Sequence, residues 1–149
     1  GNSITTCHKY AGEGFMKCYK GGCHCGHVKF EIEAPNRLVV HECNCSICKM
    51  SGFLHLIVNK ENFHLTTDIS QLTTYRFNTD TAQHVFCPNC GVKSFYVPRS
   101  HPDGFSINLR CLSNVDADDV TIHPFDGANW ETAVNTLHKD VAAQQARVK

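Results

Sequence analysis

The stretch FCPNCGVKSFYV, residues 86–97, joins a turn suited to metal binding to the start of a strand. Two residues separate Cys87 from Cys90, so both thiolates of the CPNCG turn can face one metal ion, and Gly91 permits the tight backbone that points N–H groups at sulfur. A redox CxxC pair normally begins a helix in a βαβ unit, whereas the residues after Gly91 have the character of a strand. The stretch favours a zinc knuckle over a redox pair.

The rest of the chain has the pattern of short strands. Strict alternation of apolar and polar residues over 27–34 is typical of a half-buried strand, which Pro35 ends, and residues 38–42 are expected to return as the second strand of a hairpin. Further short apolar or β-branched runs cover residues 54–58, 62–65, 73–78, 84–86, 92–97 and 105–109. Apolar residues recur at helical spacing from Trp130 to Val141. The sequence predicts a mainly β single domain with a C-terminal helix.

The length of 149 residues fits one domain. We expect a zinc-binding domain over residues 18–130, a C-terminal helix and tail over 131–149, and an N-terminal extension over 1–17, for whose first residues a cloning remnant is one interpretation. The 14 basic and 14 acidic side chains cancel, so no general attraction to nucleic acid or to an anionic membrane is expected. With no signal-peptide pattern and no run approaching roughly 18 apolar residues, we expect an intracellular protein, cytoplasmic, nuclear or both.

Ten cysteines are many for such a chain, and seven of them lie in three tight groups. Sulfurs one to three residues apart cannot easily all reach distant partners at disulfide geometry, so the grouping favours metal binding. The groups are CHC (Cys23, Cys25), CNCSIC (Cys43, Cys45, Cys48) and the CPNCG turn. Cys7, Cys18 and Cys111 have no clustered partner and are expected to be ordinary thiols.

The number of sulfurs in each group suggests two kinds of site. CHC and CPNCG supply two each, enough for a closed tetrahedral site of four thiolates, which is the structural kind. CNCSIC supplies three, and a zinc with three protein ligands and an open position is typical of a catalytic or ligand-binding site. A fourth ligand from His41, His55 or Cys111 would instead close that site, and other partitions of the seven sulfurs are also open.

The ligand type limits the chemistry. Three thiolates make Zn²⁺ a weaker Lewis acid than three histidines would, so activation of water should be less effective. Such a zinc can keep an incoming thiol deprotonated, ready to add to an aldehyde or to leave from a thiohemiacetal. The chain has no H-E-x-x-H motif, and the proline inside the CPNC turn does not fit the deaminase signature. These patterns argue against a hydrolase and a deaminase.

The segments GGCHCGHVKFE, HECNCSIC and FCPNCGVKSFYVPRS together resemble the family of glutathione-dependent formaldehyde-activating enzymes and centromere protein V, over roughly residues 18–130. The segments TTYRFNTDTAQHVFCPNCG and DGFSINLRCL are especially similar to the animal centromere protein V branch. The resemblance implies a small zinc-stabilised β-tent with two Zn²⁺ per chain. It places a structural zinc on Cys23, Cys25, Cys87 and Cys90, and a catalytic zinc on Cys43, Cys45 and Cys48.

The activity implied by the resemblance is that of a carbon–sulfur lyase, the reversible joining of glutathione, as co-substrate, to formaldehyde to give S-hydroxymethylglutathione. The expected partner is a small thiol or thiol–aldehyde adduct, with no direct nucleic-acid binding and no membrane, and a homodimer is open. One alternative is a non-catalytic zinc-binding module of the centromere protein V type, acting in chromosome or spindle organisation or in cytokinesis. A thiol redox sensor is the weakest alternative.

A few residues outside the cysteine groups are candidates for contact with substrate. Arg99, Asn108 and Arg110 are expected to bind an anionic group, because arginine pairs with carboxylates in bidentate fashion, and a loop-stabilising role is the alternative. His41 and His84 are candidate proton shuttles or structural residues near the metal groups. The aromatic side chains at Phe86, Phe95, Tyr96, Phe105 and Trp130 are expected in the core.

Overall fold

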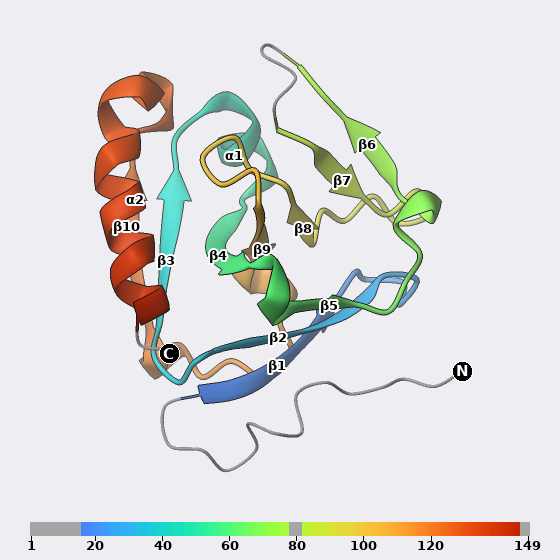
Figure 1. The fold of residues 1–149 in the computed structure, drawn as a ribbon. Helices are drawn as coiled ribbons and strands as arrows, with labels where there is room; N and C mark the ends of the chain where they lie inside the picture. The colour runs from blue at the N-terminus through green and yellow to red at the C-terminus, as the bar shows by residue number, and fades with distance from the viewer. Residues whose placement is uncertain (1–15, 78–81, 147–149) are drawn as a thin grey trace.

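The structure is a computed structural model that describes residues 16–77 and 82–146, and its strands surround one main core (Figure 1). The strands are β1 (Met16–Gly22), β2 (Lys29–Pro35), β3 (Leu38–Cys43), β4 (Leu54–Asn59), β5 (Phe63–Leu65), β6 (Thr73–Tyr75), β7 (His84–Phe86), β8 (Phe95–Tyr96), β9 (Gly104–Asn108) and β10 (Val120–Phe125). The helices are α1 (Ser46–Ser51) and α2 (Trp130–Ala146), with 3-10 turns at Lys60–Asn62, Ile69–Gln71, Leu109–Cys111, Ala117–Asp119 and Gly127–Asn129. The predicted mainly β fold with a C-terminal helix is confirmed.

A five-stranded sheet in the order β10-β3-β4-β9-β8 forms the centre of the molecule. Its β10–β3 pair is parallel, and the other pairs are antiparallel. The central strand β4 is buried from Leu54 to Val58 because both of its faces are covered. Leu54, Leu56 and Val58 belong to the main core, whereas Ile57 packs against Leu137 and Val141 of α2. The sheet therefore has a core face and a face covered by the helix.

The three-stranded sheet β1-β2-β5 covers the core face of the central sheet. Phe30 and Ile32 of β2 are buried against residues of the central sheet such as Leu56 and Ile107. The ring of Phe30 lies edge-on to the ring of Phe95, with 5.9 Å between their centroids. The third sheet is the β6–β7 pair, which lies at the end of the molecule away from α2 (Figure 1).

The expected hairpin between residues 27–34 and 38–42 is wrong. Strand β2 pairs with β1 and β5, whereas β3 pairs with β4 and β10, so the chain crosses from one sheet to the other after Pro35. The expected strand 92–97 is shorter than predicted, at Phe95–Tyr96, and CNCSIC, expected as a loop, includes the start of helix α1. Residue 78 of the expected strand 73–78 lies outside the described residues, as do residues 1–15 of the expected N-terminal extension.

Neither described helix has both the length and the apolar composition that crossing a membrane requires.

Candidate metal centres

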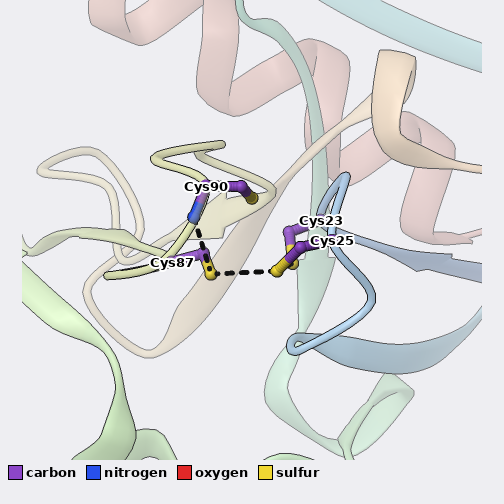
Figure 2. Close-up of side chains that lie close together, drawn as sticks. All are labelled: Cys23, Cys25, Cys87 and Cys90. Carbon is purple, nitrogen blue, oxygen red and sulfur yellow. Dashed lines mark hydrogen bonds between the residues drawn. The ribbon is translucent and has the colours of Figure 1, made fainter.

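Two turns that are distant in the sequence bring four cysteines together. Cys23 and Cys25 lie in the turn between β1 and β2, and Cys87 and Cys90 lie in the turn after β7. Their four sulfur atoms all lie within 4.8 Å of one another. Figure 2 shows the two pairs facing each other, with dashed lines from the Cys87 sulfur to the Cys25 sulfur and to the Cys90 N–H group. We call these residues the four-cysteine cluster.

The sulfur spacing of this cluster fits a tetrahedral zinc site. The Cys25 Sγ lies 3.6 Å from the Cys23 Sγ and 3.7 Å from the Cys87 Sγ. A tetrahedron of sulfurs about 2.3 Å from Zn²⁺ has edges of about 3.8 Å, whereas a disulfide needs about 2.05 Å. Backbone N–H groups also point at the sulfurs, as Gly91 predicts: Val28 donates to Cys23 at 3.2 Å, and a hydrogen bond from the Val92 N–H lowers the pKa of Cys90 to about 6.

A second group of sulfurs comes from one short segment. Cys43 ends β3, Cys45 precedes the first turn of α1, and Cys48 lies inside that helix. Their sulfur atoms lie within 4.8 Å of one another. Gly52 closes α1 with a left-handed φ of 67°, and so turns the chain into β4. We call Cys43, Cys45 and Cys48 the three-cysteine cluster.

The three sulfurs interact so strongly that they cannot all ionise unaided. A hydrogen bond from the Cys43 thiol lowers the pKa of Cys45. The same contact raises the pKa of Cys43, and contacts with both neighbours raise the pKa of Cys48. A divalent cation would remove this conflict, because metal ligation requires all three as thiolates and its charge stabilises them. The donor set therefore fits a thiophilic divalent metal such as Zn²⁺.

A cavity of about 160 Å³ opens onto the three-cysteine cluster. Its walls combine residues of the sheet with residues of α2, and they include all three cysteines together with His55, His84, Tyr96, Arg99, Trp130 and Leu137. The Arg99 guanidinium lies over the Trp130 ring, 3.8 Å from its centroid. Trp130 is half-buried in this wall, so the expectation that it belongs to the core is wrong.

His55 connects the cluster to buried hydroxyl groups. Its Nε2 lies 3.1 Å from the Cys48 Sγ, and its Nδ1 lies 2.9 Å from the Ser106 Oγ and 3.3 Å from the Tyr96 hydroxyl. Burial lowers the pKa of His55 to about 3, so the ring is neutral, and burial raises the pKa of Tyr96, so its phenol keeps its proton. Nδ1 therefore faces two hydroxyl groups and Nε2 faces the Cys48 sulfur, so the neutral ring links the cluster to both hydroxyls.

Lys93 is a residue that the sequence analysis missed. Its Nζ donates to the Nδ1 of His84 at 2.6 Å and lies 4.1 Å from the centroid of the Tyr96 ring. Burial lowers the pKa of Lys93 to about 8. Burial and the Lys93 charge lower the pKa of His84 to about 4, so His84 is neutral and Nε2 carries its proton. The available signal was a charged residue inside the apolar run VKSFYV.

Both clusters lie inside the part of the chain that matches a known protein family. The model of the glutathione-dependent formaldehyde-activating enzyme family matches residues 18–127, which include all seven clustered cysteines. The chain belongs to this family. A crystal structure of a Rhodobacter sphaeroides protein, a structural genomics target, is similar at 30% identity over 70% of this chain and 99% of that chain, with a TM-score of 0.59. Helix α2 lies beyond the matched residues.

The three residues expected to bind an anionic group lie in different places. Arg99 lines the cavity, whereas Asn108 and Arg110 do not. The buried Asn108 side chain accepts from the Arg110 N–H at 3.1 Å and donates to the Lys93 carbonyl at 3.1 Å. The exposed Arg110 donates from Nε to the Gly52 carbonyl at 3.1 Å. Asn108 and Arg110 thus stabilise the backbone beside the site.

The remaining candidate ligands are also located. Cys111 is free and half-buried, and burial raises its pKa to about 11. Cys18 is disulfide-bonded, which contradicts the expected free thiol, and Cys7 lies outside the described residues. His41 lines the cavity but contacts Asp140, with 3.3 Å between Nε2 and Oδ2. Among the candidates for a fourth ligand, His55 is therefore the one in contact with a cysteine of the three-cysteine cluster.

Proposed function

We propose that the protein is a zinc-dependent carbon–sulfur lyase that acts on adducts of glutathione and formaldehyde of the S-hydroxymethylglutathione type. The observation that carries this proposal is the cavity that opens onto three clustered cysteines. In the proposal Cys43, Cys45 and Cys48 hold the second zinc of the chain, and the four-cysteine cluster holds a structural one. When bound, the second zinc would supply a site that keeps a substrate sulfur in the thiolate form.

The chain's own residues fix the geometry of this site. In the proposal the Nε2–H group of the neutral His55 donates to the Cys48 thiolate, and the Ser106 and Tyr96 hydroxyls at Nδ1 favour that tautomer. Partners of this kind orient the first ligands of a metal and tune their basicity. Both side chains are buried, so the arrangement is rigid and shielded from water.

In the proposal, His84 interacts with the oxygen of the adduct. Its neutral ring lines the cavity and stacks on Tyr96 with 4.9 Å between centroids. The Lys93 ammonium occupies Nδ1, which leaves the Nε2–H group as the donor. A donor beside the cavity can stabilise the negative charge that develops on the aldehyde oxygen as the glutathione thiolate adds to formaldehyde and the carbon–sulfur bond forms.

In the proposal, Arg99 supplies the positive charge that binds a carboxylate of glutathione. The guanidinium lies over the Trp130 ring in the cavity wall, and a guanidinium can bind a carboxylate in bidentate fashion. We expect Arg99→Gln to weaken glutathione binding about tenfold, the loss of one charge-assisted contact of about 1.4 kcal/mol. Arg110→Gln, outside the cavity, is the matched control.

The test of the lyase proposal is a comparison of Cys45→Ser with Cys111→Ser. Zinc content and formation of S-hydroxymethylglutathione from ¹³C-formaldehyde and glutathione, followed by NMR, are measured for both variants and for the unmodified protein. We expect Cys45→Ser to stay folded, to lose about one zinc per chain and to lose turnover. Cys111→Ser should retain both. Full turnover by Cys45→Ser would show that the proposed mechanism is wrong.

We also propose a second candidate, a non-catalytic zinc-binding module in chromosome or spindle organisation or in cytokinesis, which rests on the resemblance of TTYRFNTDTAQHVFCPNCG and DGFSINLRCL to the animal centromere protein V branch alone. In this case both zinc ions only stabilise the fold. Titration calorimetry distinguishes the candidates, because a module of this kind gives no heat with glutathione, whereas the lyase gives a heat that Arg99→Gln reduces.

A further inference from the structure

Two histidines lie side by side on the face of the central sheet that α2 covers. The parallel register of β10 on β3 pairs His123 with His41, and directly paired residues project to the same face of a sheet. The two rings meet edge-on with 5.8 Å between centroids. Figure 1 shows α2 running along these two strands.

Helix α2 adds a carboxylate to this pair. The Asp140 Oδ2 lies 3.3 Å from the His41 Nε2 and 3.7 Å from the His123 Nδ1. The three ligand atoms lie within 4.8 Å of one another. Each comes from a different element, and a single oxygen faces both rings.

The distances fit metal coordination as well as they fit long hydrogen bonds. A charge-assisted N–H···O bond is about 2.7–2.9 Å long, shorter than both contacts. Ligand atoms about 2.0–2.2 Å from a tetrahedral metal ion lie about 3.4 Å apart, which is close to both observed values. His41 is buried, while His123 and Asp140 are 44% and 34% exposed, so an ion can reach the site from solvent.

We propose that His41, His123 and Asp140 form a third metal site, separate from both cysteine clusters, for a divalent transition metal such as Zn²⁺ or Co²⁺. Two imidazoles and one carboxylate suit these ions, whereas Mg²⁺ and Ca²⁺ prefer oxygen ligands alone. Three protein ligands leave at least one coordination position for water.

A metal bound at this site would link α2 to strands β3 and β10 of the central sheet. The helix supplies Trp130 and Leu137 to the cavity wall, and His41 lines the same cavity. Asp140 lies beyond the residues that match the family, so the site depends on the part of the chain outside that match. We expect the metal to stabilise the wall that α2 contributes and to leave the ligand sets of the cysteine clusters unchanged.

The test uses Co²⁺ alone as the probe, on protein whose cysteine clusters are saturated with zinc. After dialysis against micromolar Co²⁺, the unmodified chain should hold about one cobalt, with weak visible d–d absorption and no sulfur-to-cobalt charge-transfer band. His123→Gln and Asp140→Asn should hold none while keeping their zinc. His138→Gln, an exposed histidine of the same helix, is the matched control and should bind as the unmodified chain does.

Three results would overturn the proposal: no cobalt uptake by the unmodified chain, uptake that persists in both variants, or a thiolate charge-transfer band that places the cobalt in the cysteine clusters. A second measurement checks the role of α2. Co²⁺ should raise the melting temperature of the zinc-saturated unmodified chain but not that of Asp140→Asn. An equal rise in both would refute the site.

Discussion

Gly127→Ala should disturb the three-cysteine cluster more than it disturbs the fold. A Cβ atom at position 127 would overlap the Cys43 Sγ and lie 3.2 Å from the Cβ of Cys45. Gly127 begins the 3-10 turn that leads into α2, so the strain falls either on this turn or on the sulfur. Because Cys43 is held by β3, we expect its sulfur to rotate away from the position shared with Cys45 and Cys48.

The magnitude follows from the cost of overpacking. Inserting a methyl group into a filled space costs about 1–3 kcal/mol, and Gly→Ala returns about 0.4–1 kcal/mol by restricting the unfolded chain. The net cost is then about 1–2 kcal/mol. If this cost falls on the three-cysteine cluster, zinc affinity falls by about 5- to 30-fold. If it falls on the whole fold, the melting temperature falls by about 2–4 °C per kcal/mol.

The assay is competition for zinc with a chromophoric chelator, run beside thermal unfolding. Gly52→Ala is the matched control, because its Cβ meets nothing within 4 Å and the variant carries only the strain of a left-handed φ of 67°, about 1–2 kcal/mol. We expect the larger loss of stability in Gly52→Ala and weaker zinc binding in Gly127→Ala alone. Equal zinc affinities in the two variants would refute the reasoning.

Three further outcomes test the core and the surroundings of the cluster. Leu56→Ala, at a fully buried core position, should lower the free energy of unfolding in urea by about 2–5 kcal/mol and leave zinc content unchanged. Tyr96→Phe removes a hydroxyl that contacts the Nδ1 of His55, so turnover should fall about tenfold with a loss of stability of only about 1 kcal/mol, whereas unchanged turnover would separate this hydrogen bond from the reaction. The pKa of Lys93 falls from 10.5 to about 8 on folding, so the unfolded chain binds more protons between these values. The stability of the unmodified chain relative to Lys93→Met should therefore rise by about 1–3 kcal/mol from pH 8 to 10.5, and this gain should be lost as the pH falls back to 8. A stability difference that does not change with pH would show that the pKa of Lys93 is not lowered.

Sequence patterns predict the period of an element better than its surroundings. The alternation of apolar and polar residues correctly predicted a strand at β2, but the expected half-burial is wrong, because the strand is buried on both faces after Lys29, with Glu31 and Glu33 among the buried residues. Strand β10 was not predicted because its residues are largely exposed and it contains Pro124, and its parallel pairing with β3 joins segments far apart in the chain. The false hairpin has the same cause, since alternation gives the period of a strand but does not identify its neighbour.

The candidate site, like the fold, was predicted from the sequence only in part. Cysteine spacing indicated the residues of both clusters, because two residues between sulfurs are enough to let both face one ion. The cavity residues Lys93 and Trp130 were missed or misassigned, since one lies in an apolar run and the other on the apolar stripe of a helix. Their roles depend on contacts with His84 and Arg99, which only the folded chain brings together.

The arrangement of the two clusters in the chain suggests why one would serve the fold and the other chemistry. The contact between Cys25 and Cys87 closes a loop of 62 residues and joins β1 and β2 to the turn after β7, whereas Cys43 and Cys48 lie only five residues apart. The cost of loop closure grows with the logarithm of loop length, so a metal that bridges the longer loop stabilises the fold by about 2 kcal/mol more. We therefore expect Cys25→Ser to lower the free energy of unfolding by at least this much more than Cys45→Ser, measured in urea with zinc present. If Cys45→Ser were the more destabilising change, the three-cysteine cluster would be a structural site, and the cavity above it would lose its main support as a catalytic centre.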